Sequence, residues 1–372
     1  MQLAAKLGYN LTPSNSGGTD FAVAGQNSTQ TQSQVVSYLS GVGGVASPTA
    51  LYGIVAGIND LGGGNSSNVD AIAVAAADNL KNAIITLINA GAKNIIWMNL
   101  PSMQLSPDLQ GNAVMIQGVA TFNAQWATDI AALRSSYPSV NLIALDVYTE
   151  WQLLAKGVSF VFGYSINSSQ GFTQAPASVP HSAASSNPDA DYFTTWDGKH
   201  PTTFFHSIIA ANCYAALTGT PVAGTYNIAN LNSGLDLDTV GGSTSNGATV
   251  DQATPNSNSA TQKWDLINLG MSPNQYMVVN DSNGRLLDVY GGATNNGAAV
   301  VVWDSNRGAN QQWIISPASS GSYTLTGQQS GNVLDVYGFS TANGGTVNMW
   351  APNGGANQKW LLQRLDQSPQ PK

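Results

Sequence analysis

The 372-residue chain has three histidines, and one of them, His200, lies three residues after Asp197. The local sequence is Trp-Asp-Gly-Lys-His-Pro, between an aromatic, β-prone segment at 191–196 and an apolar, alanine-rich segment at 202–217. This pattern predicts a strand, a short loop and a helix, with Pro201 at the first helical position. An aspartate in such a loop can accept the imidazole Nδ1–H and leave Nε2 free as a general base. On spacing alone, the alternative is a helix-capping aspartate beside an ordinary surface histidine.

The composition excludes several classes of partner. Charged residues make up 9% of the chain, the net charge is −8, and the 12 Lys and Arg residues are scattered. We therefore expect neither a nucleic-acid partner nor binding to an anionic membrane. No apolar run approaches the roughly 20 residues needed to cross a bilayer, so we expect no membrane span. Dispersed histidines and a single cysteine argue against a metal site, and we expect no cofactor.

The first 220 residues alternate between apolar runs and helical segments. Continuous apolar runs predict strands buried on both faces, as in a parallel sheet, at 51–56, 94–100 and 141–145. Helical spacing predicts helices at 31–39, 69–90 and 112–136. This alternation predicts an α/β domain with a parallel sheet.

Two further segments precede the first of these strands. Residues 1–8 read as the end of a helix, and residues 17–26 as a short strand that runs into a glycine-containing turn. Ligands of such sheets bind at the carboxyl ends of the strands. Gly25, Asn59 and the loop of His200 all follow predicted strands, so we expect them to meet on that edge.

Three segments resemble conserved blocks of the SGNH (GDSL-type) ester hydrolases, namely FAVAGQ, YGIVAGINDLG and WDGKHPTTFFH. They occur in the order of the family's second, third and fifth blocks, and the match covers roughly residues 1–218. The resemblance implies a three-layer α/β fold and hydrolysis of acyl esters by a Ser–His–Asp triad. In this chain His200 would be the general base and Asp197 would orient it. The side-chain amide of Asn59 and the backbone N–H of Gly25 would stabilise the tetrahedral oxyanion.

The chain departs from the family pattern at its beginning. The family's serine nucleophile lies in a Gly-Asp-Ser block after the first strand, and no Gly-Asp-Ser occurs before Phe21. Ser14 and Ser16 lie in a loop with no preceding strand, so we assign neither as a nucleophile. Loss of that strand would also leave backbone groups unpaired. We therefore expect a misplaced or fragmentary start, with a secretory signal peptide lost from it. A catalytically dead hydrolase is the alternative.

Residues 219–224 read as a linker. After them helical periodicity disappears, and short strands with Gly and Asn turns take its place. Three similar segments begin at Leu237, Leu287 and Leu334, and they read LDTVGGSTSNG, LDVYGGATNNG and LDVYGFSTANG. A Gln-x-Trp follows each of them, ending at Trp264, Trp313 and Trp360. Repeats of about 50 residues are characteristic of architectures that build one shared core. We therefore predict three β units closed around a pseudo-threefold axis, with these tryptophans in the core.

The repeats resemble the ricin-B-type β-trefoil lectin domain over nearly all of residues 225–364, with 365–372 as a tail. The sugar contacts that the resemblance implies are Asp288, Trp303, Asn310, Gln311, Asp335, Asn348, Trp350, Asn357 and Gln358. A carboxylate and amides suit sugar hydroxyls, and an aromatic ring suits the apolar face of a sugar. The first repeat keeps Asp238 but has Ala253 and Thr261 at the aromatic and Asn positions, so we expect a weak or silent lobe. The alternative is that these aspartates only brace turns.

Together the two resemblances predict an exported ester hydrolase tethered to a carbohydrate-binding domain. Tethering raises the local concentration of substrate, which favours removal of acyl groups, such as O-acetyl, from decorated polysaccharide. The competing hypothesis is a sugar-binding protein whose hydrolase domain is inactive.

Overall fold

The computed structural model describes residues 2–103, 106, 108–161, 200–201, 203–268, 270, 274–306 and 308–366. Contacts between residues divide the chain into two compact units. The first unit holds the described parts of 1–152 and 169–206, and the second those of 153–168 and 207–367. By contacts, residues 207–218 thus lie with the second unit, ahead of the linker expected at 219–224.

A parallel sheet organises the first unit. Its strands are β1 (Leu51–Ile54), β2 (Asn94–Met98) and β3 (Asn141–Leu145), in the order β1-β2-β3. Leu51 pairs with Asn94, and Asn94 pairs in turn with Asn141. The middle residues of β2 and β3 are buried, as the continuous apolar runs predicted. The predicted α/β class with a parallel sheet is therefore confirmed.

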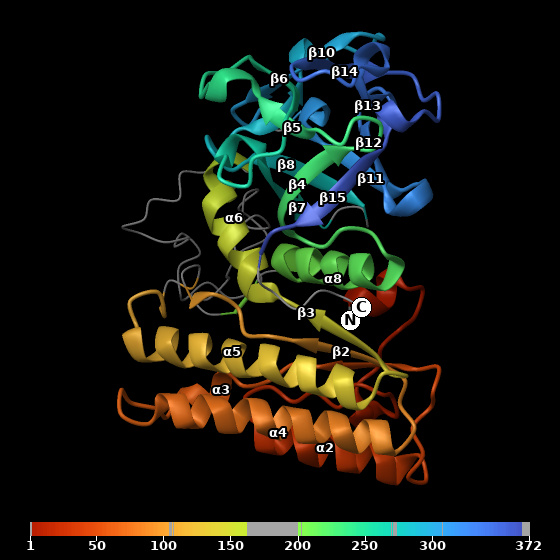
Figure 1. Ribbon diagram of the computed structural model, residues 1–372. Coiled ribbons are helices and arrows are strands. Elements are labelled where there is room, and N and C mark those ends of the chain that lie inside the picture. The colour runs from red at the N-terminus through yellow and green to blue at the C-terminus, as the bar shows by residue number, and fades with distance from the viewer. Residues whose placement is uncertain are drawn as a thin grey trace, which may run out of the picture. The chain divides into compact units, whose positions relative to one another are not determined.

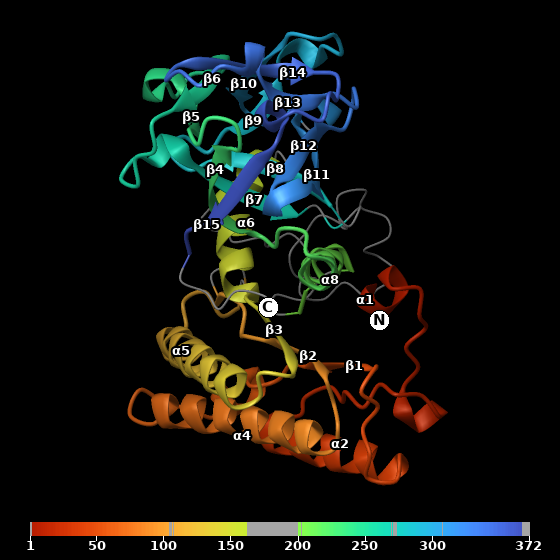
Figure 2. The same ribbon diagram turned by 45° about the vertical axis from the view of Figure 1, so that its right-hand side comes forward.

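Helices precede, connect and follow these strands along the chain. Their bounds are α1 (Gln2–Lys6), α2 (Ser28–Gly41), α3 (Ile58–Leu61), α4 (Val69–Asn89), α5 (Ala113–Ser136), α6 (Val147–Val161) and α8 (Thr203–Thr218). Figures 1 and 2 both show α2, α4 and α5 together along one face of the sheet. One apolar core joins these helices to the strands, and its largest members include Trp97, Phe122 and Trp126.

The segment before α2 differs from the prediction. Residues 21–27 form no strand, so the strand expected at 17–26 is wrong. A single parallel bridge joins Pro13 to Asp20, and a 3-10 turn, Ser14–Ser16, lies between them. Gly17, at φ +80°, then breaks the extended backbone. The short helix α1 ends before Gly8, also at φ +80°, which confirms the predicted helix stop.

Helix α4 corrects the expectation that no segment approaches membrane-spanning length. By length and composition alone, Val69–Asn89 is long and apolar enough to cross a membrane. Its buried residues include Val69, Ala73, Leu80 and Ile84, which recur at helical spacing and belong to the apolar core of the first unit. This pattern is that of a core helix with one face packed on its neighbours.

After α8, the described part of the second unit consists of β-strands with short 3-10 turns between them. The strands of the first repeat are β4 (Gly224–Asn230), β5 (Asp236–Thr239), β6 (Ala248–Ala253) and β7 (Lys263–Asn268). Those of the second are β8 (Gln275–Asn280), β9 (Leu286–Val289), β10 (Ala298–Trp303) and β11 (Trp313–Pro317). Those of the third are β12 (Tyr323–Gly327), β13 (Val333–Val336), β14 (Gly345–Trp350) and β15 (Trp360–Arg364).

The pairing of these strands closes a barrel. Antiparallel pairs run around a ring in the order β4, β7, β8, β11, β12 and β15, and β15 returns to β4. The remaining strands form three hairpins, β5–β6, β9–β10 and β13–β14. Strands β6, β10 and β14 also pair with one another. A closed barrel capped by three hairpins is a β-trefoil, so the predicted all-β second fold is confirmed.

The tryptophan of each Gln-x-Trp lies in the trefoil core, as predicted. Trp264, Trp313 and Trp360 each have 0% exposure. Each indole N–H donates to the backbone oxygen of a leucine, at 2.9, 2.9 and 3.0 Å. These three leucines open the repeated segments, at Leu237, Leu287 and Leu334. Each tryptophan therefore ties its barrel strand to the hairpin of its own repeat.

Candidate functional site

The structure brings the loop of Gly25 against Asn59. The Asn59 side-chain amide donates to the backbone oxygen of Gln26, the residue after Gly25, at 2.9 Å. Gly25 lies in a turn at φ +78°, and a Cβ added to it would meet nothing within 4 Å. Both Gly25 and Asn59 are exposed. An amide has two N–H groups, so one hydrogen of Asn59 is not used by Gln26. Asn59 therefore contacts the loop that contains Gly25, and both residues are exposed; their roles as oxyanion donors stay predictions.

A hydrogen-bond network holds these two loops in place. The Asp60 carboxylate accepts from the Ser28 backbone N–H at 2.9 Å and from the Ser28 hydroxyl at 2.6 Å. Ser28 is fully buried, and its hydroxyl also accepts from Asn79 of α4 at 3.0 Å. Sequence reasoning did not single out Asp60, although its place directly after Asn59 was a signal. The carboxylate anchors the start of α2 to α3 and so positions Gln26.

Gly57 allows the chain to turn from β1 into α3. Its φ is +121°, and a Cβ there would approach Phe122 Cε2 to 2.6 Å. Glycine is thus needed both for the backbone angle and for the contact with α5. The turn places Asn59 at the carboxyl end of β1, the edge where ligands of parallel sheets bind.

His200 is exposed and lies just before α8. The helix begins at Thr203, so Pro201 precedes it and does not occupy the first helical position, which corrects the prediction. A proline restrains the residue before it to extended backbone, and this keeps His200 outside the helix. Asp197 lies outside the described residues, so its pairing with His200 stays a prediction.

An aromatic contact ties the start of α8 to the carboxyl end of β3. Phe205 packs edge to face on Trp151 of α6, with ring centroids 5.0 Å apart and an interplanar angle of 84°. Both rings are buried, and α6 directly follows β3. The segment that carries His200 is therefore fastened to the same edge of the sheet that carries Asn59.

The second trefoil lobe gathers most of its predicted sugar contacts around Asp288. This carboxylate is 2% exposed and accepts from the Asn310 amide at 2.7 Å. Burial raises the pKa of Asp288 to about 6, against the opposing effect of hydrogen bonds from Gln311 and Asn310. Trp303 is partly exposed and packs beside Tyr290, with ring centroids 5.8 Å apart. The lobe thus combines a carboxylate, an amide and an aromatic face.

The third lobe repeats this arrangement with one further polar group. Asp335 accepts from Asn357 at 2.7 Å and from Gln358 at 2.9 Å. Trp350 is partly exposed beside Tyr337, again with centroids 5.8 Å apart. Asn348 lies directly opposite Asp335 in the hairpin, where the second lobe has Val301 opposite Asp288.

Among the described residues, two side-chain oxygens of the third lobe are buried without a partner, as are Asp238 Oδ1 and Thr239 Oγ1 of the first lobe. The Oδ1 atoms of Asn348 and Asn357 accept no hydrogen bond from the part of the chain that the structure describes. Their residues are only 6% and 1% exposed. A buried acceptor without a partner is unfavourable.

Gln311 and Gln358 hold their lobes together from within. Gln358 donates to the Ala351 backbone oxygen at 3.0 Å and accepts from the Asn353 N–H at 2.7 Å. Gln311 makes the equivalent pair of bonds with Asp304 and Asn306, both at 2.8 Å. Gln358 is 2% exposed and Gln311 is 0% exposed. These bonds give them a positioning role, and their predicted direct contact with sugar stays a prediction.

An asparagine from the preceding repeat completes each lobe. Asn246 accepts from the Asp304 N–H at 2.8 Å, and Asn296 accepts from the Ala351 N–H at 2.8 Å. Asn343 accepts from the Thr254 N–H at 2.7 Å, which closes the ring of three repeats. The bonded residue in each case directly follows the aromatic position or its equivalent. Sequence reasoning missed this role, although each repeated segment ends in Asn-Gly.

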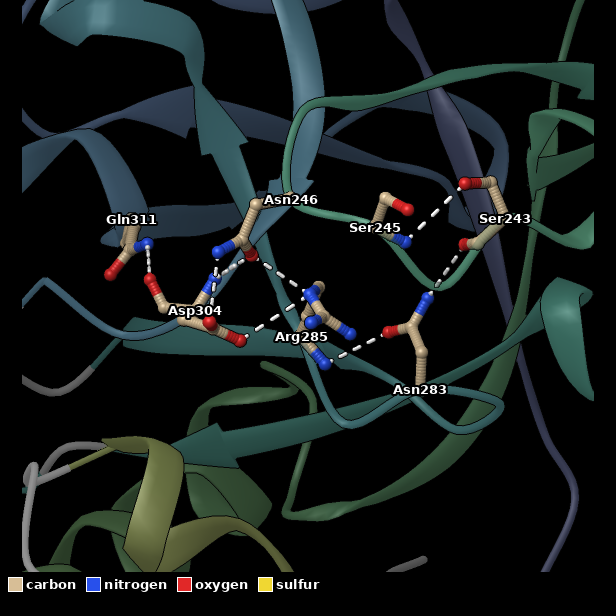
Figure 3. Close-up of polar contacts among 7 residues, drawn as sticks. All are labelled: Ser243, Ser245, Asn246, Asn283, Arg285, Asp304 and Gln311. Carbon is tan, nitrogen blue, oxygen red and sulfur yellow. Dashed lines mark hydrogen bonds and ion pairs between the residues drawn. The ribbon is translucent and has the colours of Figure 1, made fainter.

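The second lobe adds an ion pair at this junction. Figure 3 shows Arg285, Asn246 and Asp304 converging, with Gln311 on the far side of Asp304. The Arg285 Nε donates to the Asn246 Oδ1 at 2.8 Å and lies 3.3 Å from the Asp304 carboxylate. Neither of the other lobes has this pair, because Leu235 and Asn332 stand at the position of Arg285. The junction braces the backbone that carries Trp303.

The first lobe has acquired an acidic pair where the others have none. Asp238 is paired directly across the hairpin with Asp251. Gln262 donates to Asp238 at 2.9 Å, but Thr261 bonds to the Ser259 hydroxyl at 2.6 Å. With Ala253 at the aromatic position, the lobe has no stacking ring there. Weak or absent sugar binding by this lobe stays a prediction.

We predict that Asp251→Asn stabilises the trefoil at pH 7 by up to about 1 kcal/mol, because like charges directly across a hairpin repel. Burial, followed by the charge of Asp238, raises the pKa of Asp251 from 3.8 to about 6. A carboxyl pKa that is higher in the folded chain makes stability fall as pH rises from about 4 to about 6. The gain should therefore be full at pH 7 and absent at pH 4. Urea unfolding monitored by tryptophan fluorescence at both pH values measures it.

The third lobe offers the matched control for this prediction. Asn348→Asp would place a second carboxylate opposite Asp335 and should destabilise the trefoil at pH 7 but not at pH 4. An Asp251→Asn effect of equal size at both pH values would show that charge repulsion is not its cause.

Comparison with known families decides what the first unit is. The model of the GDSL-like lipase/acylhydrolase family matches residues 2–213, more than half of the chain. The chain belongs to the GDSL-like lipase/acylhydrolase family. A ricin-type β-trefoil lectin domain-like model matches the rest in three overlapping segments, 216–303, 260–350 and 309–369. Both resemblances drawn from the sequence are thereby confirmed. The family supports hydrolysis of esters in general, and the lectin-like repeats support a carbohydrate-binding module.

Solved structures similar to this GDSL-family chain match part of it. The designed threefold-symmetric protein ThreeFoil is 36% identical over 38% of this chain and 99% of its own, with a TM-score of 0.37. An exo-β-1,3-galactanase from Clostridium thermocellum is 33% identical over 39% of this chain and 31% of its own, with a TM-score of 0.37. The Macrolepiota procera ricin B-like lectin, solved with lactose, is 21% identical over 39% of this chain and 100% of its own, with a TM-score of 0.34. The comparison with curated proteins finds no match.

Proposed function

We propose that this chain hydrolyses acyl esters carried by a glycan, and that its trefoil holds the enzyme on that glycan. The observation that carries the proposal is the contact of Asn59 with the loop of Gly25, at the carboxyl end of a parallel sheet. In a chain of the GDSL-like family, two adjacent N–H donors at that edge suit a developing oxyanion. Removal of O-acetyl groups from polysaccharide is the reaction that best joins the two units.

His200 and Asp197 supply the proton transfers in this proposal. The imidazole Nε2 takes a proton from the attacking water and gives it to the leaving alcohol, while Asp197 holds Nδ1–H. The tetrahedral oxygen receives hydrogen bonds from the free N–H of Asn59 and from the Gly25 backbone. The exposure of Gly25, Asn59 and His200 supports a site that accepts the ester groups of a bulky polymer.

The second and third lobes are the proposed sugar sites. Each places a buried aspartate, an asparagine amide and a partly exposed tryptophan on one face. Vicinal hydroxyls would bind the carboxylate and amide, and the apolar face of the sugar would stack on the ring. Two sites on one chain increase retention on a polymer beyond either alone. Action on a polysaccharide further suggests that the protein works outside the cell.

The test is hydrolysis of a chromogenic acetyl ester by the full chain and by its His200→Ala variant. We assign no serine nucleophile within residues 1–372, so we expect residual activity, in which His200 activates water. Loss of the base should lower it by about 10²-fold. Equal background rates from both chains would reject the hydrolase and leave a sugar-binding protein.

A further inference from the structure

One position in the repeats carries a large side chain where the backbone favours glycine. The first and second repeats have Gly242 and Gly292, each at φ +65°. The third repeat has Phe339 there, at φ +56°. This left-handed conformation is unfavourable for any residue with a Cβ. Strain of this kind persists where the surrounding structure enforces it, and it often marks a binding site.

The Phe339 side chain is not used by the core. It is 53% exposed, so the usual reason for an aromatic residue, burial in the interior, does not apply. Its backbone is held in place by Asn232, whose amide donates to the Phe339 oxygen at 3.1 Å. The strained backbone therefore presents an apolar ring to the surface of the third lobe.

Glycine at 355 places this ring beside the proposed sugar site. A Cβ built on Gly355 would lie 2.9 Å from Phe339 Cε1 and 2.5 Å from Asn357 Oδ1. The ring edge and this buried, unpartnered amide oxygen therefore flank the same point. Asn357 in turn donates to Asp335. Phe339 thus borders the third lobe on the side of Asn357.

The second lobe shows what the site looks like without this ring. At the corresponding Gly308, the atoms nearest to an added Cβ belong to Asn310 and Asn306, and none of them is aromatic. The Tyr–Trp pairs of the two lobes have the same centroid distance, 5.8 Å. The aromatic lining of the third lobe therefore differs from that of the second by the addition of Phe339.

We propose that Phe339 forms a second stacking surface, which binds the sugar unit next to the one held by Asp335 and Trp350. An exposed ring offers its face to the C–H face of a pyranose. The third lobe would then recognise glycan chains of at least two units, whereas the second, with Gly292, reads a single unit. This inference rests on the proposed sugar-binding function and adds a subsite to it.

The experiment isolates the third lobe in the full chain with Trp303→Ala, which disables the second. Calorimetric titration uses galactose, glucose and xylose with β-1,3-galactobiose, cellobiose and xylobiose as probes. We expect at least one disaccharide to bind about fivefold more tightly than its monosaccharide, roughly 1 kcal/mol. Phe339→Gly should remove this preference and leave monosaccharide affinity within about twofold. Phe339→Tyr should retain it.

Two measurements separate the subsite from a structural role. The melting temperature of the Phe339→Gly variant should be no lower than that of its parent, because glycine adopts this backbone without strain. The matched gain-of-function variant is Gly292→Phe in a chain that also carries Trp350→Ala. This variant should give the second lobe a preference for disaccharide. Three results would each overturn the subsite. Phe339→Gly could weaken monosaccharide and disaccharide binding equally, or it could leave the preference for disaccharide unchanged. The Trp303→Ala parent could also show no preference for disaccharide. Failure of the unsubstituted chain to bind any of the six probes would instead reject the sugar-binding function itself.

Discussion

Replacing Trp303 and Trp350 together by alanine is expected to release the chain from immobilised polysaccharide, with a loss of apparent affinity of at least about 10²-fold. Aromatic rings at the centre of a binding site typically contribute 2 kcal/mol or more. Each tryptophan is partly exposed and lies at the end of a hairpin strand whose partner strand carries the aspartate of the lobe. Retention on a panel of immobilised polysaccharides, measured for the full chain, tests this result.

The single variants Trp303→Ala and Trp350→Ala test whether the two lobes act together. If both lobes hold the same polymer, each single replacement should weaken retention, and the double should lose the avidity that comes from two sites on one chain. Tyr9→Ala provides the control, because Tyr9 is an aromatic residue with 72% exposure outside the trefoil. Retention of the double variant at the level of the unsubstituted chain would discredit both proposed sugar sites.

Asn59→Ala is expected to lower kcat for a chromogenic acetyl ester by about 10²-fold or more, with little change in KM. Loss of one oxyanion donor has an effect of this size in other hydrolases. The effect falls on kcat because the oxygen carries its full charge only near the transition state. Steady-state kinetics of the full chain, with the rate of spontaneous hydrolysis subtracted, measure it.

Asn65→Ala is the matched control for this prediction. Asn65 is an exposed asparagine a few residues further along the chain, and its side chain bonds only locally, to Ser67. Its replacement should leave kcat unchanged. A higher KM with unchanged kcat in Asn59→Ala would mean that the amide holds substrate without stabilising the oxyanion.

The elements of both units could be predicted largely from local patterns. Apolar runs predicted β1, β2 and β3, because strands buried on both faces have no polar side. Burial on both faces is wrong for β1, in which Ile54 is buried but Gly53 is exposed. Helical spacing predicted α4 and α5 to within a few residues. The strand predicted at 17–26 does not form. Among the described residues no neighbouring strand pairs with this segment, and glycines at positive φ interrupt its extended backbone.

The candidate sites were predictable only in part. Residue types and order pointed to Asn59 and Gly25, but their contact through the Gln26 oxygen depends on how α2 and α3 pack. The buried positions of Gln311 and Gln358 could not be read from the sequence, since their bonds run to backbone atoms several residues away. The expected meeting of Asp197 with His200 lies outside the described residues.

The sequence by itself determined the two fold classes. The spacing of apolar residues and the threefold repeat can both be read from residues close together in the chain. The sequence also determined that the first repeat differs from the others, since Ala253 and Thr261 are visible substitutions. Only the tertiary structure decided which groups face each other. The opposition of Asp238 to Asp251 and the Asn246 bond to the next repeat arise from strand register and ring closure. Such pairings join distant residues, and their geometry is set by the whole fold.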